Sequence, residues 1–182
     1  MKKITSILLT LIMSTSMIIA GNPFFEESKQ PHGTFPFNEL KNEHFMPALE
    51  EAIKQHNAEI DAIINNPEKA TFENTIVALE RSGKMYSRVL TIFFALNSAE
   101  TNDEMQALEQ QIIPIITEHG NTISLNEKLF ARVKEVYSQK DKLKLTVEQQ
   151  MLLKNTYESF ANNGADLSAE KKEVYKKLSQ DL

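Results

Sequence analysis

The chain has 182 residues, a formal net charge of −5 and no cysteine, which is about the length of one domain. The absence of cysteine excludes disulfides, thiolate metal sites and cysteine nucleophiles. The acidic balance argues against nucleic acid as a partner, because phosphate backbones are bound by basic surfaces. Five Gly and six Pro are few, and Leu, Glu and Lys are common, so the composition favours an all-α fold.

Residues 1–20 are typical of a signal peptide. Lys2 and Lys3 form a basic start, residues 4–19 are mostly apolar, and Ala20-Gly21 offers a cleavage point with small side chains. The alternative is a membrane anchor, but the apolar run falls short of the ~20 residues that a bilayer needs and contains several Ser and Thr. We therefore expect an exported chain, periplasmic or secreted after cleavage, that meets the membrane only during export.

The rest of the chain divides into a lead-in and a helical region. Residues 21–41 contain Pro23, Pro31 and Pro36, which block regular helix, and several phenylalanines. This composition predicts an extended lead-in whose aromatic rings pack onto another element. Residues 42–182 show only helical periodicity. They are predicted to form a multi-helix antiparallel array with a long central helix.

The first two predicted helices are defined by apolar spacing. One runs from Asn42 to Ile64, and Asn65-Asn66-Pro67 ends it. The long central helix is predicted over residues 71–96, with Gly83 allowing close approach of a neighbouring helix. Its seam follows an alternating spacing of four and three, through Phe72, Ile76, Leu79, Gly83, Tyr86, Leu90 and Phe93.

The later helices are predicted from capping residues. The box Thr101–Glu104 should open a helix that bends at Pro114 and ends at Gly120-Asn121. Further starts are predicted at Ser124–Glu127, at Thr146–Gln149 and at Ser168. The helix that begins at Thr146 should stop at Asn162-Asn163-Gly164, whereas the last one shows no stop signal before Leu182.

No catalytic residue and no metal ligand is predicted in this chain, and its substrate-binding residues are unknown. Zinc peptidases commonly present H-E-x-x-H on a helix, and the histidines here lack that spacing: His32, His44, His56 and His119. They are expected to cap helices, to lie at the surface or to be hydrogen-bonded. Ser82 is expected to lie within a helix and to bond back to it. The lysines of residues 140–144 and 171–177 are predicted to be solvated.

Four segments, in order, resemble the thimet oligopeptidase family of zinc metallopeptidases: Phe37–Ala48, Thr71–Glu80, Ser98–Gln106 and Phe160–Leu167. Within this family the chain looks most similar to bacterial peptidyl-dipeptidase and oligopeptidase A, from about residue 22 to residue 182. The resemblance implies a long all-helical peptidase with a channel between two halves. It also implies hydrolysis of short peptides by a zinc-activated water.

The resemblance implies that the catalytic region lies outside this chain. The family holds zinc by H-E-x-x-H and a downstream Glu in its later half, and no position here matches those residues. We therefore expect an N-terminal fragment that forms a wall of the substrate channel, is inactive alone, and belongs to a parent with zinc as cofactor. The alternative is a free-standing peptide-binding or interaction module of the cell envelope, or a plain structural bundle. Whether the parent releases dipeptides or cuts internally is left open.

Overall fold

The computed structural model describes residues 21–181, and the predicted signal peptide, residues 1–20, lies outside the described residues. The described part is built from helices, turns and loops without any strand, so the predicted all-α fold is confirmed. These residues fold as two compact units. The first contains residues 21–54 and 85–108, and the second contains residues 55–84 and 109–181. Within residues 21–181, no helix has both the length and the apolar character needed to cross a membrane.

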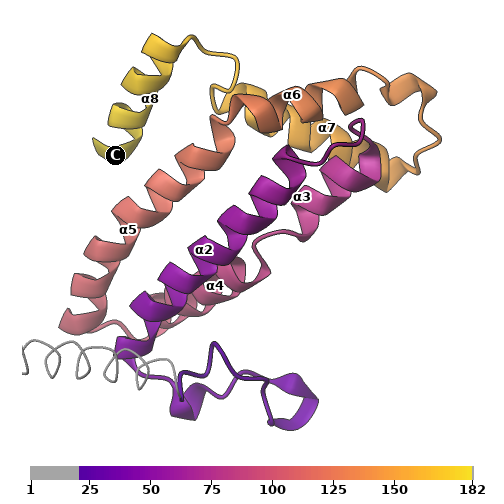
Figure 1. Cartoon of the computed structure of the whole chain (residues 1–182). Helices are drawn as coiled ribbons and strands as arrows, with labels where there is room; N and C mark the ends of the chain where they lie inside the picture. Colours follow the sequence, from indigo (N-terminus) through magenta and orange to yellow (C-terminus); the bar gives the residue numbers. More distant parts are fainter. Residues whose placement is uncertain (1–20, 182) are drawn as a thin grey trace, which may run out of the picture. The chain divides into compact units, whose positions relative to one another are not determined.

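The first unit combines the lead-in with parts of three helices. Its helical parts come from α2 (Phe45–Ile64), α4 (Lys84–Ala99) and α5 (Asp103–Ser124). The lead-in is not wholly extended, because it forms two short 3-10 turns, η1 (Pro31–Gly33) and η2 (Phe37–Glu39). A third, η3 (Asn42–His44), stands where the first helix was predicted to begin, and α2 starts after it. Figure 1 shows it as a looped segment before the start of α2.

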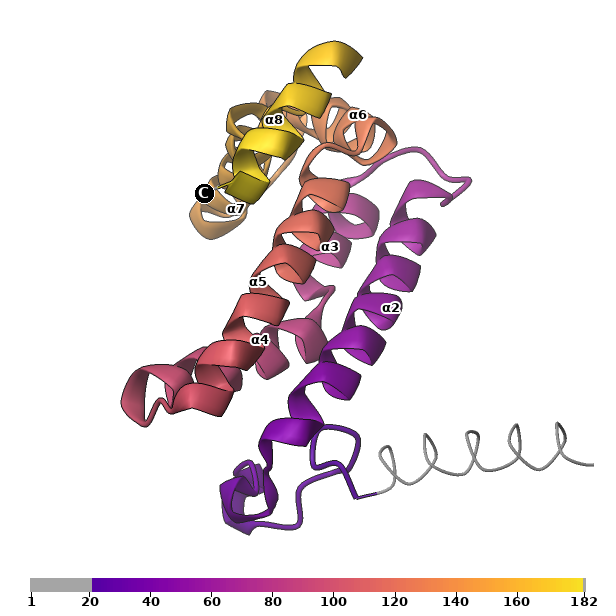
Figure 2. The same cartoon turned by 90° about the vertical axis from the view of Figure 1, so that its left-hand side faces the viewer.

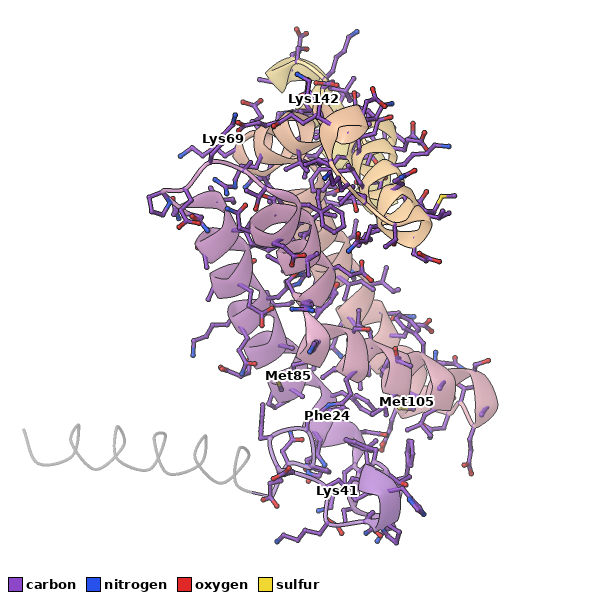
Figure 3. All side chains as sticks on the ribbon, turned by 90° about the vertical axis from the view of Figure 1, so that its right-hand side faces the viewer. Phe24, Lys41, Lys69, Met85, Met105 and Lys142 are labelled. Atoms are coloured by element: carbon purple, nitrogen blue, oxygen red, sulfur yellow. The ribbon has the colours of Figure 1, made fainter. Side chains whose placement is uncertain are left out.

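The lead-in packs its aromatic rings onto the helices of this unit, as its composition predicts. Phe24 is only 1% exposed, and its ring centroid lies 4.8 Å from that of Phe35 and 5.7 Å from that of Phe45. Phe45 in turn meets Phe93 of α4 edge to face, at 5.1 Å. The Arg88 guanidinium of α4 also donates to the Phe24 carbonyl, so the lead-in lies against both α2 and α4 (Figure 3).

Hydrogen bonds fix the beginning of the lead-in. Asn22 is fully buried, and its Nδ2 donates to the His44 carbonyl at 2.9 Å while its Oδ1 accepts the Phe24 N–H at 3.1 Å. His44 is a capping residue, as expected for one of the histidines, because its Nδ1 accepts the Lys41 N–H at 3.1 Å. Since buried polar groups are costly unless paired, these bonds explain why Asn22 can be buried.

The second unit gathers the end of α2, most of α5 and the remaining helices. These are the π-helical turn η4 (Phe72–Val77), α3 (Ala78–Arg81), α6 (Glu127–Tyr137), the 3-10 turn η5 (Lys140–Lys142), α7 (Val147–Asn162) and α8 (Ala169–Asp181). Helices α6 and α7 pack against each other and against η4 (Figure 2). The core lies between them and consists of Ile60, Ile63, Ala70, Phe72, Ile76, Leu129, Phe130, Val133, Val136, Leu153, Phe160 and Ala165.

The predicted continuous helix over residues 71–96 is wrong, because the chain breaks at Ser82-Gly83. Ser82 is extended, with a ψ of 163°, and Gly83 adopts a left-handed φ of 66°. The Gly83 N–H donates to a Glu59 carboxylate oxygen instead of to a helical carbonyl. Only glycine adopts this conformation without strain, so Gly83 serves a change of direction here.

Helix α5 begins one residue later than the predicted capping box would place it. The cap is Asn102 rather than Thr101, because the Asn102 side chain accepts the Met105 N–H at 2.9 Å. The helix continues through Pro114, so this proline does not end it. The expected bend at Pro114 stays a prediction.

Helix α5 also ends later than expected. It runs through Gly120 and Asn121 to Ser124, and the next helix is capped by Asn126, whose side chain accepts an N–H of α6 at 3.0 Å. Gly and Asn inside a helix each cost only about 1 kcal/mol or less, so tertiary contacts override the predicted stop. The other predicted stops and caps are confirmed: Asn65–Pro67 follows α2, Thr146 caps α7 and Ser168 precedes α8.

Arg132 of α6 fastens the loop between α2 and η4. Its guanidinium donates to the carbonyls of Asn66 and Glu68 at 3.1 and 3.3 Å and to the Asn74 side chain at 3.2 Å. Replacing Arg132 with alanine should lower the free energy of unfolding by about 1–3 kcal/mol, because these acceptors lose a charged donor. Urea unfolding followed by circular dichroism measures this, with the exposed Arg81→Ala as control. Equal effects of the two substitutions would refute the role given to Arg132.

Candidate functional site

A chain of three polar side chains connects separate helices of the second unit. His56 lies on α2, His119 on α5, and Ser82 at the break after α3. His56 Nε2 lies 3.2 Å from Ser82 Oγ, and His56 Nδ1 lies 3.0 Å from His119 Nε2. The two imidazole rings meet edge to face, with centroids 5.0 Å apart. This arrangement joins residues that are as many as 63 positions apart in the sequence.

The hydrogen bonds determine which imidazole nitrogens carry protons. The Ser82 hydroxyl donates to the Leu79 carbonyl at 2.7 Å, so its oxygen is left to accept from His56 Nε2–H. His56 Nδ1 is then an acceptor, and His119 Nε2–H donates to it. His56 is neutral in this arrangement, because its Nδ1 carries no proton. Each group therefore donates a hydrogen bond to the next: His119 to His56, His56 to Ser82, and Ser82 to the backbone carbonyl of Leu79.

The same cluster holds the helix break in place. The Gly83 N–H donates to Glu59 Oε2 at 2.6 Å, and Glu59 lies one turn after His56 on α2. The His56 ring also covers Gly83 closely. A Cβ built on Gly83 would lie 2.8 Å from His56 Cε1, closer than real Cβ contacts. Glycine is thus required at this position both by its φ and by the imidazole that packs on it.

Burial keeps both histidines neutral. Burial, with a smaller contribution from neighbouring His56, lowers the pKa of His119 from 6.5 to about 4, and this side chain is only 5% exposed. Burial also lowers the pKa of His56, although the Glu59 carboxylate acts in the opposite direction. A neutral His56 is what the hydrogen-bond order requires, because a second proton on its Nδ1 would face the His119 Nε2–H.

The cluster lacks the arrangement of a serine nucleophile and its base. A catalytic histidine accepts the serine proton, whereas here the Ser82 hydroxyl proton points to the Leu79 carbonyl and His56 donates to the oxygen. The predicted bond from Ser82 back to its helix is therefore confirmed, although Ser82 lies at a helix end. Within residues 21–181, no three His, Asp or Glu side chains converge as ligands of a metal ion would. The cluster therefore stabilises the break between α3 and α4.

The remaining residues singled out in the sequence lie apart from this cluster. His32 is exposed in η1, with a φ of 60°, and His44 caps the start of α2. The expectation that the lysines of residues 171–177 are solvated is wrong for Lys172, which is 7% exposed. Its ammonium lies 2.9 Å from Glu127 Oε1 and 3.3 Å from the Leu125 carbonyl, and these contacts compensate its burial.

Segment Thr71–Glu80, which carries much of the resemblance, is architectural. Thr71 and Asn74 cap η4 reciprocally, at 2.8 and 3.1 Å, and Phe72, Thr75 and Ile76 are buried. At the other end of the unit, the N–H of Ala165 donates to the Phe160 carbonyl and closes α7. These residues thus build helix ends and the core.

No protein-family model matches the chain. It is 39% identical over 160 residues to dipeptidyl carboxypeptidase from Escherichia coli (strain K12), covering 88% of this chain and 24% of that protein. It is 38% identical over 163 residues to dipeptidyl carboxypeptidase from Salmonella typhimurium, covering 90% and 24%. Oligopeptidase A from Haemophilus influenzae is 24% identical over 143 residues, covering 79% and 21%.

This chain, which is all-helical over its described residues, is therefore related to peptidases. The resemblance to the thimet oligopeptidase family is confirmed, because proteins named dipeptidyl carboxypeptidase and oligopeptidase A are similar to this chain. The chain spans about a quarter of the length of the curated relatives it matches.

Proposed function

We propose that this chain is the N-terminal part of an exported zinc metallopeptidase that hydrolyses short peptides, and that its helices form a wall of the substrate channel. The observation that carries the proposal is the pairing of identity with coverage. The chain is 39% identical to a dipeptidyl carboxypeptidase over 88% of its own length, yet it covers only 24% of that peptidase. About three quarters of such a peptidase therefore lies outside the segment that matches this chain, and its catalytic residues can lie there.

The side chains of the described part support an architectural role. The residues that carry the resemblance cap helices or fill the core, as Thr71, Asn74 and Ile76 do. A catalytic zinc needs several protein ligands and an open position. Residues 21–181 do not fit this requirement, because their one close pair of histidines, His56 and His119, is hydrogen-bonded to each other and no third ligand converges on it. Zinc would therefore be held by other residues of the parent.

Export is supported by the sequence of residues 1–20, with its basic start, apolar run and small residues at the cleavage point. The same features give the membrane a transient role during export. Short peptides are proposed as substrates of the parent because the relatives are named as peptidases, and the acidic charge of the chain argues against nucleic acid.

The test is to read the gene beyond codon 182 and to express the longest polypeptide that it encodes. We expect an added helical region containing H-E-x-x-H, because catalytic zinc is commonly held on such a helix. The long polypeptide should hydrolyse short peptides, lose this activity with a chelator and regain it with zinc, whereas the 182-residue chain should be inactive. Mass spectrometry of the envelope fraction should find a chain starting near Gly21.

Two results would contradict the proposal. One is an unrelated gene directly after a true terminator, with no H-E-x-x-H encoded in any frame downstream. In that case the free-standing module of the cell envelope becomes the better interpretation. The other is chelator-sensitive hydrolysis by the 182-residue chain alone, since that would require a complete zinc site within it.

A further inference from the structure

Helix α8 is held to the second unit by its polar side chains. Lys172 is buried and bonds Glu127 and the Leu125 carbonyl at 2.9 and 3.3 Å. One turn later the Tyr175 hydroxyl lies 3.4 Å from Asn163 Oδ1. The side of α8 that faces its own unit is thus polar along its first turns.

The last turns of α8 are attached in the same manner. Ser179 Oγ accepts from the buried amide of Asn121 on α5 at 2.8 Å. Gln180 Nε2 donates to Glu118 Oε2, also on α5, at 3.0 Å. Figure 1 shows α8 as a peripheral helix that follows the loop after α7. The buried or half-buried side chains that attach α8, Lys172, Tyr175 and Ser179, are therefore polar.

The apolar residues of α8 point away from this attachment. Val174 is 54% exposed and Leu178 is 59% exposed, and residues four apart lie next to each other on a helix surface. A surface helix normally turns its apolar stripe toward the core and its polar face toward water. Helix α8 does the reverse. We call Val174 and Leu178 together the α8 outer face.

We infer that the α8 outer face is an interaction surface for the part of the peptidase that lies beyond this chain. The inference rests on the proposed function, which gives the chain a larger helical parent. The relatives are about four times as long as the segment they share with this chain, so they supply the polypeptide that can cover the face. The partner is an apolar helix surface of that polypeptide, into which Val174 and Leu178 insert.

The chemistry of the face disfavours other occupants. Two side chains are a small patch, and a stable dimer of two copies needs a much larger buried area. Exposed charges of both signs flank the pair, including Glu170, Glu173 and Lys177. Such a mixture does not suit insertion into lipid, where basic residues predominate beside the apolar face. It does suit the polar rim of a protein interface.

The test replaces the matched segment of Escherichia coli dipeptidyl carboxypeptidase with the corresponding residues of this chain. Into this chimera we introduce the double substitution Val174→Glu and Leu178→Glu, and separately the control Lys177→Glu. The double substitution should lower the thermal midpoint of the chimera by several degrees, because it buries two carboxylates, whereas the control should leave the midpoint unchanged. In the full 182-residue chain both variants should unfold at the same urea concentration as the unaltered chain.

The outcomes separate this inference from the proposed function. Equal midpoints of the double variant and the control in the chimera would overturn the inference, as would a chimera that does not fold. A lower urea midpoint of the double variant in the 182-residue chain would overturn it too, because its own unit would then cover the face. Loss of a dimer of the 182-residue chain, seen by sedimentation, would assign the face to a second copy. Peptidase activity of the folded chimera bears on the proposed function alone.

Discussion

Replacing Gly83 with alanine should lower the free energy of unfolding of the chain by about 2–6 kcal/mol. The left-handed φ of 66° costs about 1–3 kcal/mol for a residue with a Cβ. The new methyl group would also lie 2.8 Å from His56 Cε1, and overpacking of this kind costs about 1–3 kcal/mol. Urea unfolding followed by circular dichroism measures the change.

Gly120→Ala is the matched control for this substitution. Gly120 lies inside α5 and a Cβ added there meets nothing within 4 Å, so alanine should leave stability unchanged or raise it by up to about 1 kcal/mol. In a His56→Ala background, Gly83→Ala should cost only the backbone part, because the imidazole that the new methyl group would meet is absent. Equal stability of the Gly83→Ala and Gly120→Ala variants would show that the break needs no glycine.

Acidification should destabilise the second unit through His119. The pKa of His119 is about 4 in the folded chain and near 6.5 when it is unfolded, so the unfolded state binds the proton more tightly. The stability from its neutral form is present above pH 6.5 and is lost as the pH falls toward 4. The whole loss is about 3 kcal/mol, from about 1.4 kcal/mol for each pH unit. The facing His56, whose pKa is also lowered, adds in the same direction, and Glu59 opposes it.

The measurement compares the unaltered chain with His119→Gln in urea unfolding between pH 7.5 and pH 4.5. Glutamine keeps an N–H donor for His56 and does not titrate. Carboxylates contribute equally to both proteins, so the difference between the two profiles reports His119 together with its effect on His56. We expect the unaltered chain to lose its advantage across the window from pH 6.5 to pH 4. Parallel profiles over this window would show that His119 is not held neutral by the fold.

The sequence predicts the all-α fold and several helix ends well, because these depend on neighbours in the chain. The reciprocal cap of Thr146 and Gln149 forms within four residues, and its pattern is visible in the sequence. The resemblance to the peptidase family likewise rests on short contiguous segments. Where stability is decided locally, residue spacing is enough to predict structure.

The break at Ser82-Gly83 could not be predicted in this way. The apolar spacing of four and three continues through Gly83, so periodicity alone indicates one helix. The break is decided by Glu59 and His56, which lie on another helix and meet Gly83 only in the folded chain. The contact of His56 with His119 spans 63 residues and has no sequence signal. A histidine that follows no ligand spacing can still be central to the fold.

The run of lysines near the end of the chain shows the same limit. Lys171 and Lys172 are identical side chains side by side in the sequence, yet one is exposed and the other buried. The difference arises because α8 turns Lys172 toward the Leu125 carbonyl and Glu127. Composition predicts a solvated face, and only the direction of each side chain around the helix shows which lysine departs from it.

The burial of Asn22 has a consequence for the timing of maturation. A processing protease needs the chain on both sides of its bond to be extended and reachable, and the proposed cleavage point at Ala20-Gly21 lies next to this fully buried residue. Once Asn22 has bonded the His44 carbonyl and Phe24 has entered its aromatic cluster, the residues that follow the proposed cleavage point are fixed in the folded lead-in. If the chain is exported as proposed, docking of the lead-in would compete with a protease that needs these residues extended. The relative rates of docking and cleavage would then set how much precursor stays uncut.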